Sequence, residues 1–183
     1  MGYVAARSQY LKQTSQFVRG AIKSGHGILH EPDSGGCTLL KIRPAKHGDA
    51  KALTQLMHQS SAYEGNYASI LDGYAITPAQ LDAEIFYVAV LQDAIAGFYS
   101  LTLTDEPELD LMFVADHAQG TGIGGKLFQH MVAEAKRRGI PSIKIVSHPP
   151  SVGFYQRMGA TIVGTKLPKM KVTWARPILN LAI

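Results

Sequence analysis

The chain has 183 residues, 46% of them hydrophobic and 17% charged, which suits one globular domain with its own core. No apolar run approaches about 18 residues, so we expect no membrane-spanning helix. A formal charge of +4 without a dense Lys/Arg cluster suits a polyanionic small ligand, and we expect neither a nucleic acid nor a membrane as partner. The single cysteine, Cys37, excludes an internal disulfide framework, and the histidines lack metal-ligand spacing, so no metal is expected.

Residues 1–36 differ in composition from the rest of the chain. No acidic residue precedes Glu31, and apolar residues recur there at intervals of seven and four, at Val4, Leu11, Val18 and Ile22. This pattern fits a basic amphipathic helix or an organellar transit segment. A secretory signal is not expected, because the segment has no apolar core of the required length. We expect an extra N-terminal arm, partly disordered or packed on the domain or a partner, followed by the main domain at 37–183 in a cytoplasmic protein.

The first half of the main domain predicts a strand, two helices and a loop. Residues 38–43 are strand-like and end at a proline, and 49–59 have apolar residues on one helical face behind an aspartate cap. Residues 60–76 are aromatic and loop-like. Residues 77–80, Thr-Pro-Ala-Gln, form a capping box with proline at the first helical position, so a short helix begins there.

The next elements predict an antiparallel meander followed by a helical crossover. Three strand-like runs at 85–91, 95–104 and 108–114 are joined by short turns. A helix follows at 124–138, and then a fifth strand at 142–147. Because a helix separates the fourth and fifth strands, these two should be parallel.

The C-terminal region predicts a short helix at 151–158 and a final hairpin between 161–166 and 170–174. The last stretch, 176–183, is apolar enough to form a subunit contact, as in a homodimer, or to extend the sheet. The whole main domain is therefore expected to be α+β with a mixed sheet.

A glycine-rich turn from Gln119 to Lys126 separates the fourth strand from the helix after it. Glycines allow the backbone to approach a ligand closely, since no Cβ intervenes. The unpaired amides of a helix N-terminus favour negative charge. The turn therefore has the chemistry of a phosphate or pyrophosphate site.

Three other interpretations of this turn stay open. Gly120, Gly122 and Gly125 satisfy the dinucleotide pattern GxGxxG, but that motif should follow the first strand of an alternating β/α series. A phosphate-loop NTPase would need Ser or Thr where this chain has Leu127, because that hydroxyl holds magnesium. The third alternative is a purely structural turn without a ligand.

Two blocks, taken together, resemble the GNAT superfamily of N-acetyltransferases. Gln119-x-x-Gly122-x-Gly124 resembles its acetyl-CoA signature, Arg/Gln-x-x-Gly-x-Gly/Ala. Residues 151–160 resemble its FYxxxGF segment, with Ala160 in place of the usual aromatic residue. The resemblance implies an α+β fold (α/β/α layered) with a mixed, mostly antiparallel sheet of six to seven strands, in which strands 4 and 5 splay apart.

The resemblance also implies where acetyl-CoA binds. The pantetheine arm would lie between the splayed strands along the backbone of the fourth, and the pyrophosphate would bind the amides of the glycine turn. His148 stands where the superfamily commonly has an asparagine that contacts the cofactor arm. The implied cofactor residues are Met112, Phe113, Val114, Gln119, Gly120, Thr121, Gly122, Ile123, Gly124, Gly125, Lys126, His148 and Phe154.

Three side chains are candidates for proton handling. Tyr155 matches the tyrosine that often acts as general acid toward the departing thiolate. With ordinary pKa values of about 10 for a phenol and about 8.5 for a thiol, a hydrogen bond to the thiolate is favoured over full proton transfer. Glu108 and Asp110 lie two apart on the fourth strand, hence on one face if the strand is regular. One of them is expected to accept the proton of the amine through water; the alternative is that both are solvated carboxylates.

The acceptor pocket is expected at the variable segment 60–76, with Tyr63, Glu64, Tyr67 and Tyr74 as its lining, although tyrosines in a loop are as often packing residues. Aromatic rings with one carboxylate suit an amine with some apolar bulk. The sequence thus predicts an acetyl-CoA-dependent N-acetyltransferase that acts on a small-molecule or peptide amine by direct transfer in a ternary complex. The alternative is a non-catalytic acyl-CoA sensor on the same fold.

Overall fold

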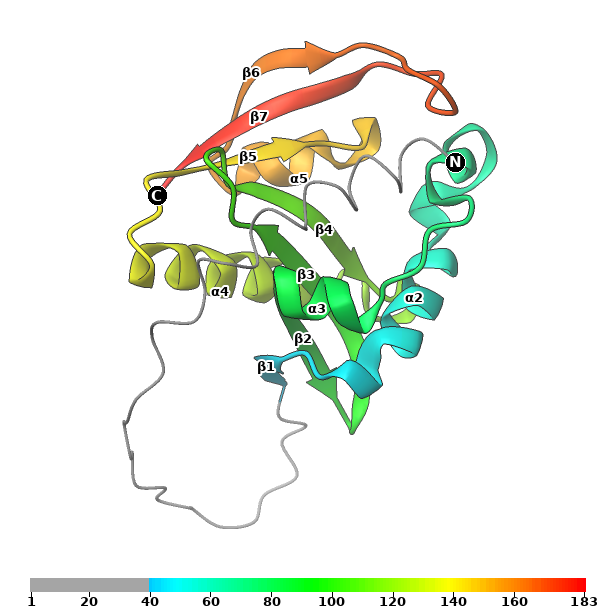
Figure 1. Cartoon of the computed structure of the whole chain (residues 1–183), viewed down its shortest axis with the longest axis vertical. Coiled ribbons are helices and arrows are strands. Elements are labelled where there is room, and N and C mark those ends of the chain that lie inside the picture. Colours follow the sequence, from blue (N-terminus) through cyan, green and yellow to red (C-terminus); the bar gives the residue numbers. More distant parts are fainter. Residues whose placement is uncertain (1–39) are drawn as a thin grey trace. The chain divides into compact units, whose positions relative to one another are not determined.

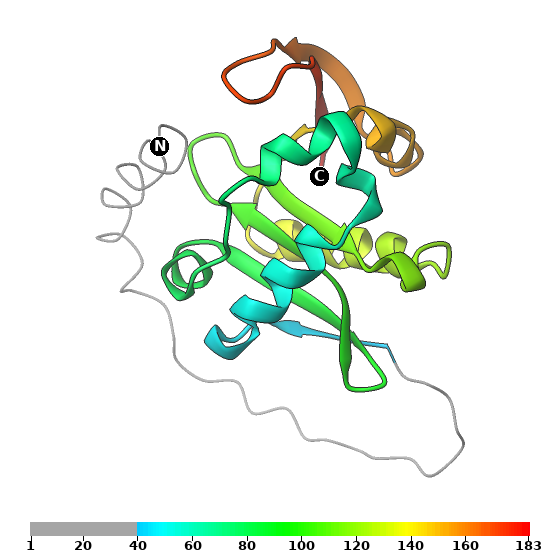
Figure 2. The same ribbon diagram turned by 90° about the vertical axis from the view of Figure 1, so that its right-hand side faces the viewer.

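The computed structural model describes residues 40–183; the predicted arm at 1–36, together with Cys37, lies outside them. This part of the chain forms a seven-stranded sheet in the order β1-β2-β3-β4-β5-β7-β6. Figures 1 and 2 show α2 on one face of the sheet and α4 on the other. The strands are β1 Lys41–Pro44, β2 Ile85–Leu91, β3 Ala94–Thr102, β4 Glu108–Val114, β5 Ser142–Val146, β6 Thr161–Lys166 and β7 Arg176–Ala182.

The helices cover both faces because each presents an apolar stripe to the sheet. On α4, Leu127, Met131 and Ala135 recur every fourth residue and are fully buried; on α2, Leu53 and Met57 do the same. The α-helices are α2 Ala50–His58, α3 Pro78–Ala83, α4 Ile123–Arg137 and α5 Val152–Arg157. The 3-10 helices are η1 His47–Asp49, η2 Ser61–Tyr63, η3 Gly65–Leu71, η4 Asp116–Ala118 and η5 Pro149–Ser151.

The predicted meander and crossover are confirmed. Strands β2, β3 and β4 pair in sequence as antiparallel neighbours, and β5 is parallel to β4 after the α4 crossover. The capping box at 77–80 is half formed: the Thr77 hydroxyl accepts a hydrogen bond from the Gln80 amide, but the Gln80 side chain turns to the Tyr74 hydroxyl and Glu84 instead.

The predicted final hairpin between 161–166 and 170–174 is wrong. Strand β6 pairs instead with β7, with Lys166 opposite Arg176, and β7 lies between β5 and β6. Two backbone hydrogen bonds close residues 169–172 into a tight turn, which leaves that segment too short for a strand. Leu179 and Leu181 of β7 are buried in the core, so the apolar C-terminal stretch extends the sheet; a homodimer stays a prediction.

Strands β4 and β5 are splayed. Their pairing is limited to Glu108 with Lys144 and Leu109 with Ile145, next to a hydrogen bond from the Lys144 amide to the carbonyl of Pro107. Strand β4 nevertheless continues beside β3 as far as Val114. The edge of β4 that faces β5 is therefore open over its second half, as the family resemblance implies.

One glycine allows β3 and β4 to lie close under α4. A Cβ on Gly97 would stand 2.8 Å from the carbonyl oxygen of Phe113 and 3.0 Å from Cδ1 of Leu127. Gly97→Ala is expected to lower the free energy of unfolding by about 1–3 kcal/mol, because the backbone oxygen cannot move aside freely. Urea denaturation measures this loss. Gly48→Ala is the control, since no atom lies within 4 Å of its added Cβ; an equal loss in both variants would contradict the prediction.

Candidate active site

A cavity of about 580 Å³ opens where β4 and β5 diverge. Its wall contains main-chain and side-chain groups from β4, the glycine turn, β5, α5 and η2. The predicted site residues that line it are Tyr63, Asp110, Met112, Phe113, Val114, Gln119, Gly120, Gly122, Gly124, Gly125, His148, Phe154 and Tyr155. The topology thus gathers into one cavity most residues that the sequence assigned to the donor.

The glycine turn forms an open cradle of amides. Gly120 and Gly122 have φ of 75° and 86°, a left-handed conformation that glycine adopts readily. The first hydrogen bond of α4 runs from the Lys126 amide to the Gly122 carbonyl. Among residues 40–183, no acceptor is recorded for the amides of residues 120–125. These amides and the helix N-terminus fit a diphosphate.

Side chains of the turn anchor it to the domain. Ile123, the first residue of α4, is buried in the core, and the Thr121 hydroxyl donates to the Ala118 carbonyl at 2.6 Å. The Gln119 amide group donates to Asp116 at 2.8 Å and to the Val114 carbonyl at 3.3 Å, so it joins the turn to the end of β4. Lys126 is exposed and lies outside the cavity wall.

Asp116 was missed in the sequence, and it connects the two sides of the site. Its carboxylate accepts the Gln119 hydrogen bond and also the backbone amide of Ser61, at 3.1 Å. Ser61 begins η2, which brings Tyr63 to the cavity. A single aspartate just after a strand, with partners far away in the sequence, gives no local signal of this role.

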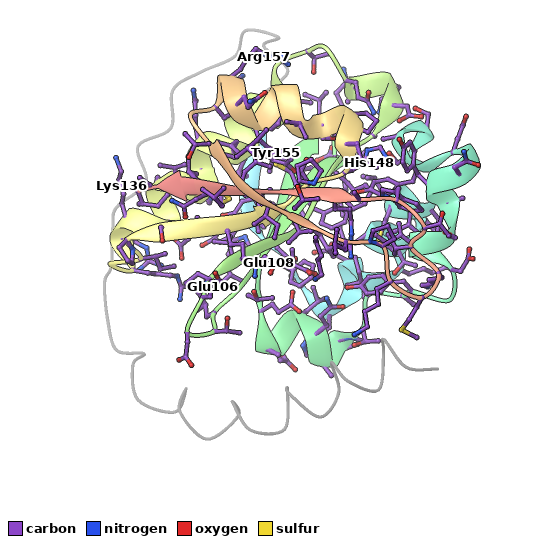
Figure 3. All side chains as sticks on the ribbon, turned by 90° about the horizontal axis from the view of Figure 1, so that it is seen from above. Glu106, Glu108, Lys136, His148, Tyr155 and Arg157 are labelled. Atoms are coloured by element: carbon purple, nitrogen blue, oxygen red, sulfur yellow. The ribbon has the colours of Figure 1, made fainter. Side chains whose placement is uncertain are left out.

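The two candidate carboxylates on β4 are separated by a β-bulge. Leu111 pairs with Ser100 and Leu109 with Leu101, so Asp110 is the extra residue. The regular strand on which the one-face argument depended is therefore absent. Asp110 lines the cavity, whereas Glu108 does not; its carboxylate lies 3.7 Å from the Lys144 ammonium, which also binds Glu106. Figure 3 labels Glu106 and Glu108 beside each other.

Tyr155 of α5 lines the cavity and is buried, with 9% of its surface exposed. Its ring packs edge-on against Phe154, with 5.3 Å between centroids. Burial, with a smaller contribution from nearby Tyr63, raises the pKa of Tyr155 well above that of a free phenol. The phenol is therefore neutral near pH 7 and suited to donate a hydrogen bond rather than to release its proton.

The predicted acceptor residues are only partly gathered by the fold. Tyr63 lines the cavity and packs against Phe113, and burial raises its pKa to about 12. Tyr67 contacts His148 and Trp174 by ring edges. Tyr74 is held by the Gln80 side chain at 2.7 Å, and Glu64 is exposed; like Tyr67, neither lines the cavity.

Within the described part of the chain, no group of His, Cys, Asp and Glu side chains is arranged to hold a metal ion. Across the same residues, no helix has the length and apolar character needed to cross a bilayer.

Comparison with known proteins identifies the family. A family model described as an acetyltransferase (GNAT) domain matches residues 49–172. The 5-NmdU N-acetyltransferase of Pseudomonas phage PaMx11 is 33% identical over 132 residues, which cover 70% of this chain and 92% of that protein.

Two solved structures show the same fold with the donor or its product bound. The PaiA N-acetyltransferase of Thermoplasma acidophilum, in complex with coenzyme A, has a TM-score of 0.67 and 17% identity, over 79% of this chain and 99% of that one. A GNAT family acetyltransferase from Elizabethkingia anophelis with acetyl-CoA bound has a TM-score of 0.59 and 21% identity, over 79% and 98%. The chain therefore belongs to the GNAT acetyltransferase family and is an acyltransferase.

Proposed function

We propose that this protein transfers an acetyl group from acetyl-CoA to the amine of a small molecule or peptide, by direct attack in a ternary complex. The observation that supports this most strongly is the juxtaposition, in one cavity, of unpaired amides in the glycine turn, an open strand edge and a buried tyrosine. A diphosphate, a pantetheine arm and a thioester need these three environments in that order.

On the donor side, the amides of residues 120–125 would hold the diphosphate and fix it through main-chain hydrogen bonds. The backbone of Met112, Phe113 and Val114, which β5 does not cover, would bind the pantetheine arm as a strand would. One of these amides would also hold the thioester carbonyl, where a single donor contributes roughly 3–4 kcal/mol to the transition state. The Tyr155 phenol would stabilise the departing thiolate.

On the acceptor side, Asp110 would attract the ammonium form of the amine, and Tyr63 and Phe113 would pack against its apolar part. An alkyl amine with a pKa of about 10.4 is only about one part in 2,500 neutral at pH 7. A negative charge in the cavity raises the local concentration of the protonated amine. A proton acceptor must then convert this ammonium into the neutral amine that attacks the thioester. Of the two carboxylates predicted to act on the amine, Asp110 lines the cavity and Glu108 does not, which supports Asp110 as the one that meets the ammonium.

Release of free thiol from acetyl-CoA tests the proposal against a panel of amines. The panel includes 5-NmdU, which appears in the name of the phage N-acetyltransferase, together with polyamines, amino acids, aminoglycosides and peptide N-termini. Acceptor-dependent thiol release supports the enzyme. Saturable coenzyme A binding without release on any acceptor would favour the acyl-CoA sensor instead.

The two carboxylates on β4 are expected to behave differently. Asp110→Asn should lower kcat/KM for the amine about tenfold or more, mostly through KM, since a charge-assisted hydrogen bond contributes roughly 1.5–3 kcal/mol. Glu108→Gln is the matched control and should leave kcat/KM unchanged, because Glu108 lies outside the cavity wall beside Lys144. Steady-state rates with the best acceptor of the panel measure both. Equal losses in the two variants would contradict this assignment.

A further inference from the structure

His148 is a buried imidazole in the cavity wall whose two ring nitrogens have no hydrogen-bond partner within residues 40–183. Only 6% of its surface is exposed. It lies two residues after the end of β5, and its carbonyl accepts hydrogen bonds from the Ser147 hydroxyl and the Ser151 amide, so the main chain is fixed while the ring is unpaired. Buried polar groups are nearly always hydrogen-bonded, so such a ring in a cavity indicates a partner supplied by a ligand.

The surroundings of His148 keep its ring neutral. Tyr63 of η2 packs against it with 4.6 Å between ring centroids, and Tyr67 of η3 meets it edge-on at 4.3 Å. Both neighbours are aromatic rings, and no ion pair to His148 is recorded among the described residues. Burial lowers the pKa of His148 below its ordinary value, so the ring has an available lone pair at pH 7.

The other titratable and charged groups in the same wall are few. Asp110 of β4 and Tyr155 and Arg157 of α5 line the cavity with His148. Arg176 of β7 acts electrostatically on Tyr63, in the opposite direction to Asp110. Figure 3 labels His148 and Tyr155, which reach the cavity from the segment after β5 and from α5.

We infer that His148 is the group that accepts the proton of the acceptor ammonium before the amine attacks the thioester. The inference rests on the proposed acetyl transfer and assigns to His148 a role beyond the cofactor contact implied by its position. In their ordinary states, an imidazole with a pKa of about 6.5 is a stronger base than a carboxylate with a pKa of about 3.9, and burial, which lowers the pKa of His148, reduces this difference. Asp110 then attracts the ammonium, and His148 deprotonates it.

The step balances as follows. One ring nitrogen of His148 takes one proton from the ammonium, and the neutral amine nitrogen forms a bond to the acetyl carbonyl carbon. The carbon–sulfur bond breaks, and the sulfur leaves as thiolate, which takes the second proton lost by the nitrogen. His148 returns its proton to water. The net change is ammonium and thioester to amide, thiol and one proton.

A His148 variant and a control variant test the inference with the best acceptor of the panel. His148→Asn should lower kcat about 100-fold at pH 7 while coenzyme A still raises the melting temperature as in the wild type. In the wild type, kcat should level off above the pKa of His148. In the variant it should keep rising about tenfold per pH unit from pH 6 to 9, as the free amine becomes more abundant. His47→Gln, which alters an exposed histidine paired with Asp82, should change neither quantity.

A second variant and a direct titration keep the test independent of folding effects. Imidazole added to His148→Ala should restore part of the lost rate. Proton NMR of the wild type with coenzyme A should show the His148 ring titrating below about 6.5.

The inference is overturned if both His148 variants keep the wild-type kcat and pH profile, or if they lose only coenzyme A binding. The inference is also overturned if Asp110→Asn, with His148 intact, abolishes the levelling of kcat at high pH, because Asp110 would then be the group that accepts the proton. Absence of turnover by the wild type on every acceptor would instead refute the proposed function.

Discussion

Replacing Gly122 by alanine is expected to weaken coenzyme A binding about 100-fold, which corresponds to the loss of one or two charge-assisted hydrogen bonds of roughly 1.5–3 kcal/mol each. Gly122 lines the cavity, and the added Cβ would meet no protein atom within 4 Å, so it would occupy space that is open to a ligand. The left-handed φ of 86° would also be strained, which would displace the neighbouring amides.

Gly139→Ala separates these two effects. Gly139 follows α4, has a φ of 69° and likewise has no atom within 4 Å of an added Cβ, but it does not line the cavity. Both variants should lose about 1–2 kcal/mol of folding stability through backbone strain. Only Gly122→Ala should lose the stabilisation by coenzyme A, from about 2.7 to about 0.4 kcal/mol at a ligand concentration 100 times the wild-type dissociation constant. Similar coenzyme A responses in the two variants would show that the diphosphate binds elsewhere.

Replacing Tyr155 by phenylalanine is expected to lower kcat by about 100-fold or more while coenzyme A affinity stays unchanged. Removal of one preorganised donor to a developing negative charge typically costs about 2.7–4 kcal/mol in the transition state. Tyr99→Phe is the matched control. Tyr99 is also a buried tyrosine with a raised pKa, but its hydroxyl pairs with His130 at 3.0 Å, outside the cavity wall.

The pH dependence of Tyr155 follows from the direction of its pKa shift. A phenol donates a hydrogen bond only while it is protonated, and burial raises the pKa of Tyr155. The donor should therefore persist to higher pH than a free phenol, and the wild-type kcat should show no loss from this group below about pH 10. An alkaline fall near pH 8–9 that disappears in Tyr155→Phe would contradict this prediction, because it would mean that the pKa of Tyr155 is lowered in the enzyme.

Sequence patterns predicted the elements that depend on local periodicity and turn chemistry. Strand β4 has the predicted bounds 108–114, and α4 begins within one residue of the predicted start, because the glycine turn marks the boundary in the sequence itself. The glycine turn proposed to bind the donor could be found in the sequence for the same reason: its groups are main-chain amides whose exposure depends on glycines close together in the chain.

The acceptor half depends on contacts between distant residues and was predicted less well. The bulge at Asp110 leaves no trace in the alternation of β4, and the sequence does not reveal that Asp110 lines the cavity while Glu108 does not. Tyr74 is held away by Gln80, and β7 displaces the shorter segment at 170–174 from the sheet. The surroundings of His148 come from η2 and η3, far earlier in the sequence, so its orphaned ring could be found only in three dimensions.

The short pairing between β4 and β5 has a consequence for the whole domain. Within residues 40–183, the parallel ladder between the meander and the C-terminal strands is limited to the pairs at Glu108 and Leu109, next to the hydrogen bond from Lys144 to Pro107. If the pantetheine arm binds along β4 as proposed, it supplies the rungs that the polypeptide lacks. The donor then acts as a temporary eighth strand. Its hydrogen bonds to β4 form when it binds and are lost when the product departs, once in every catalytic cycle.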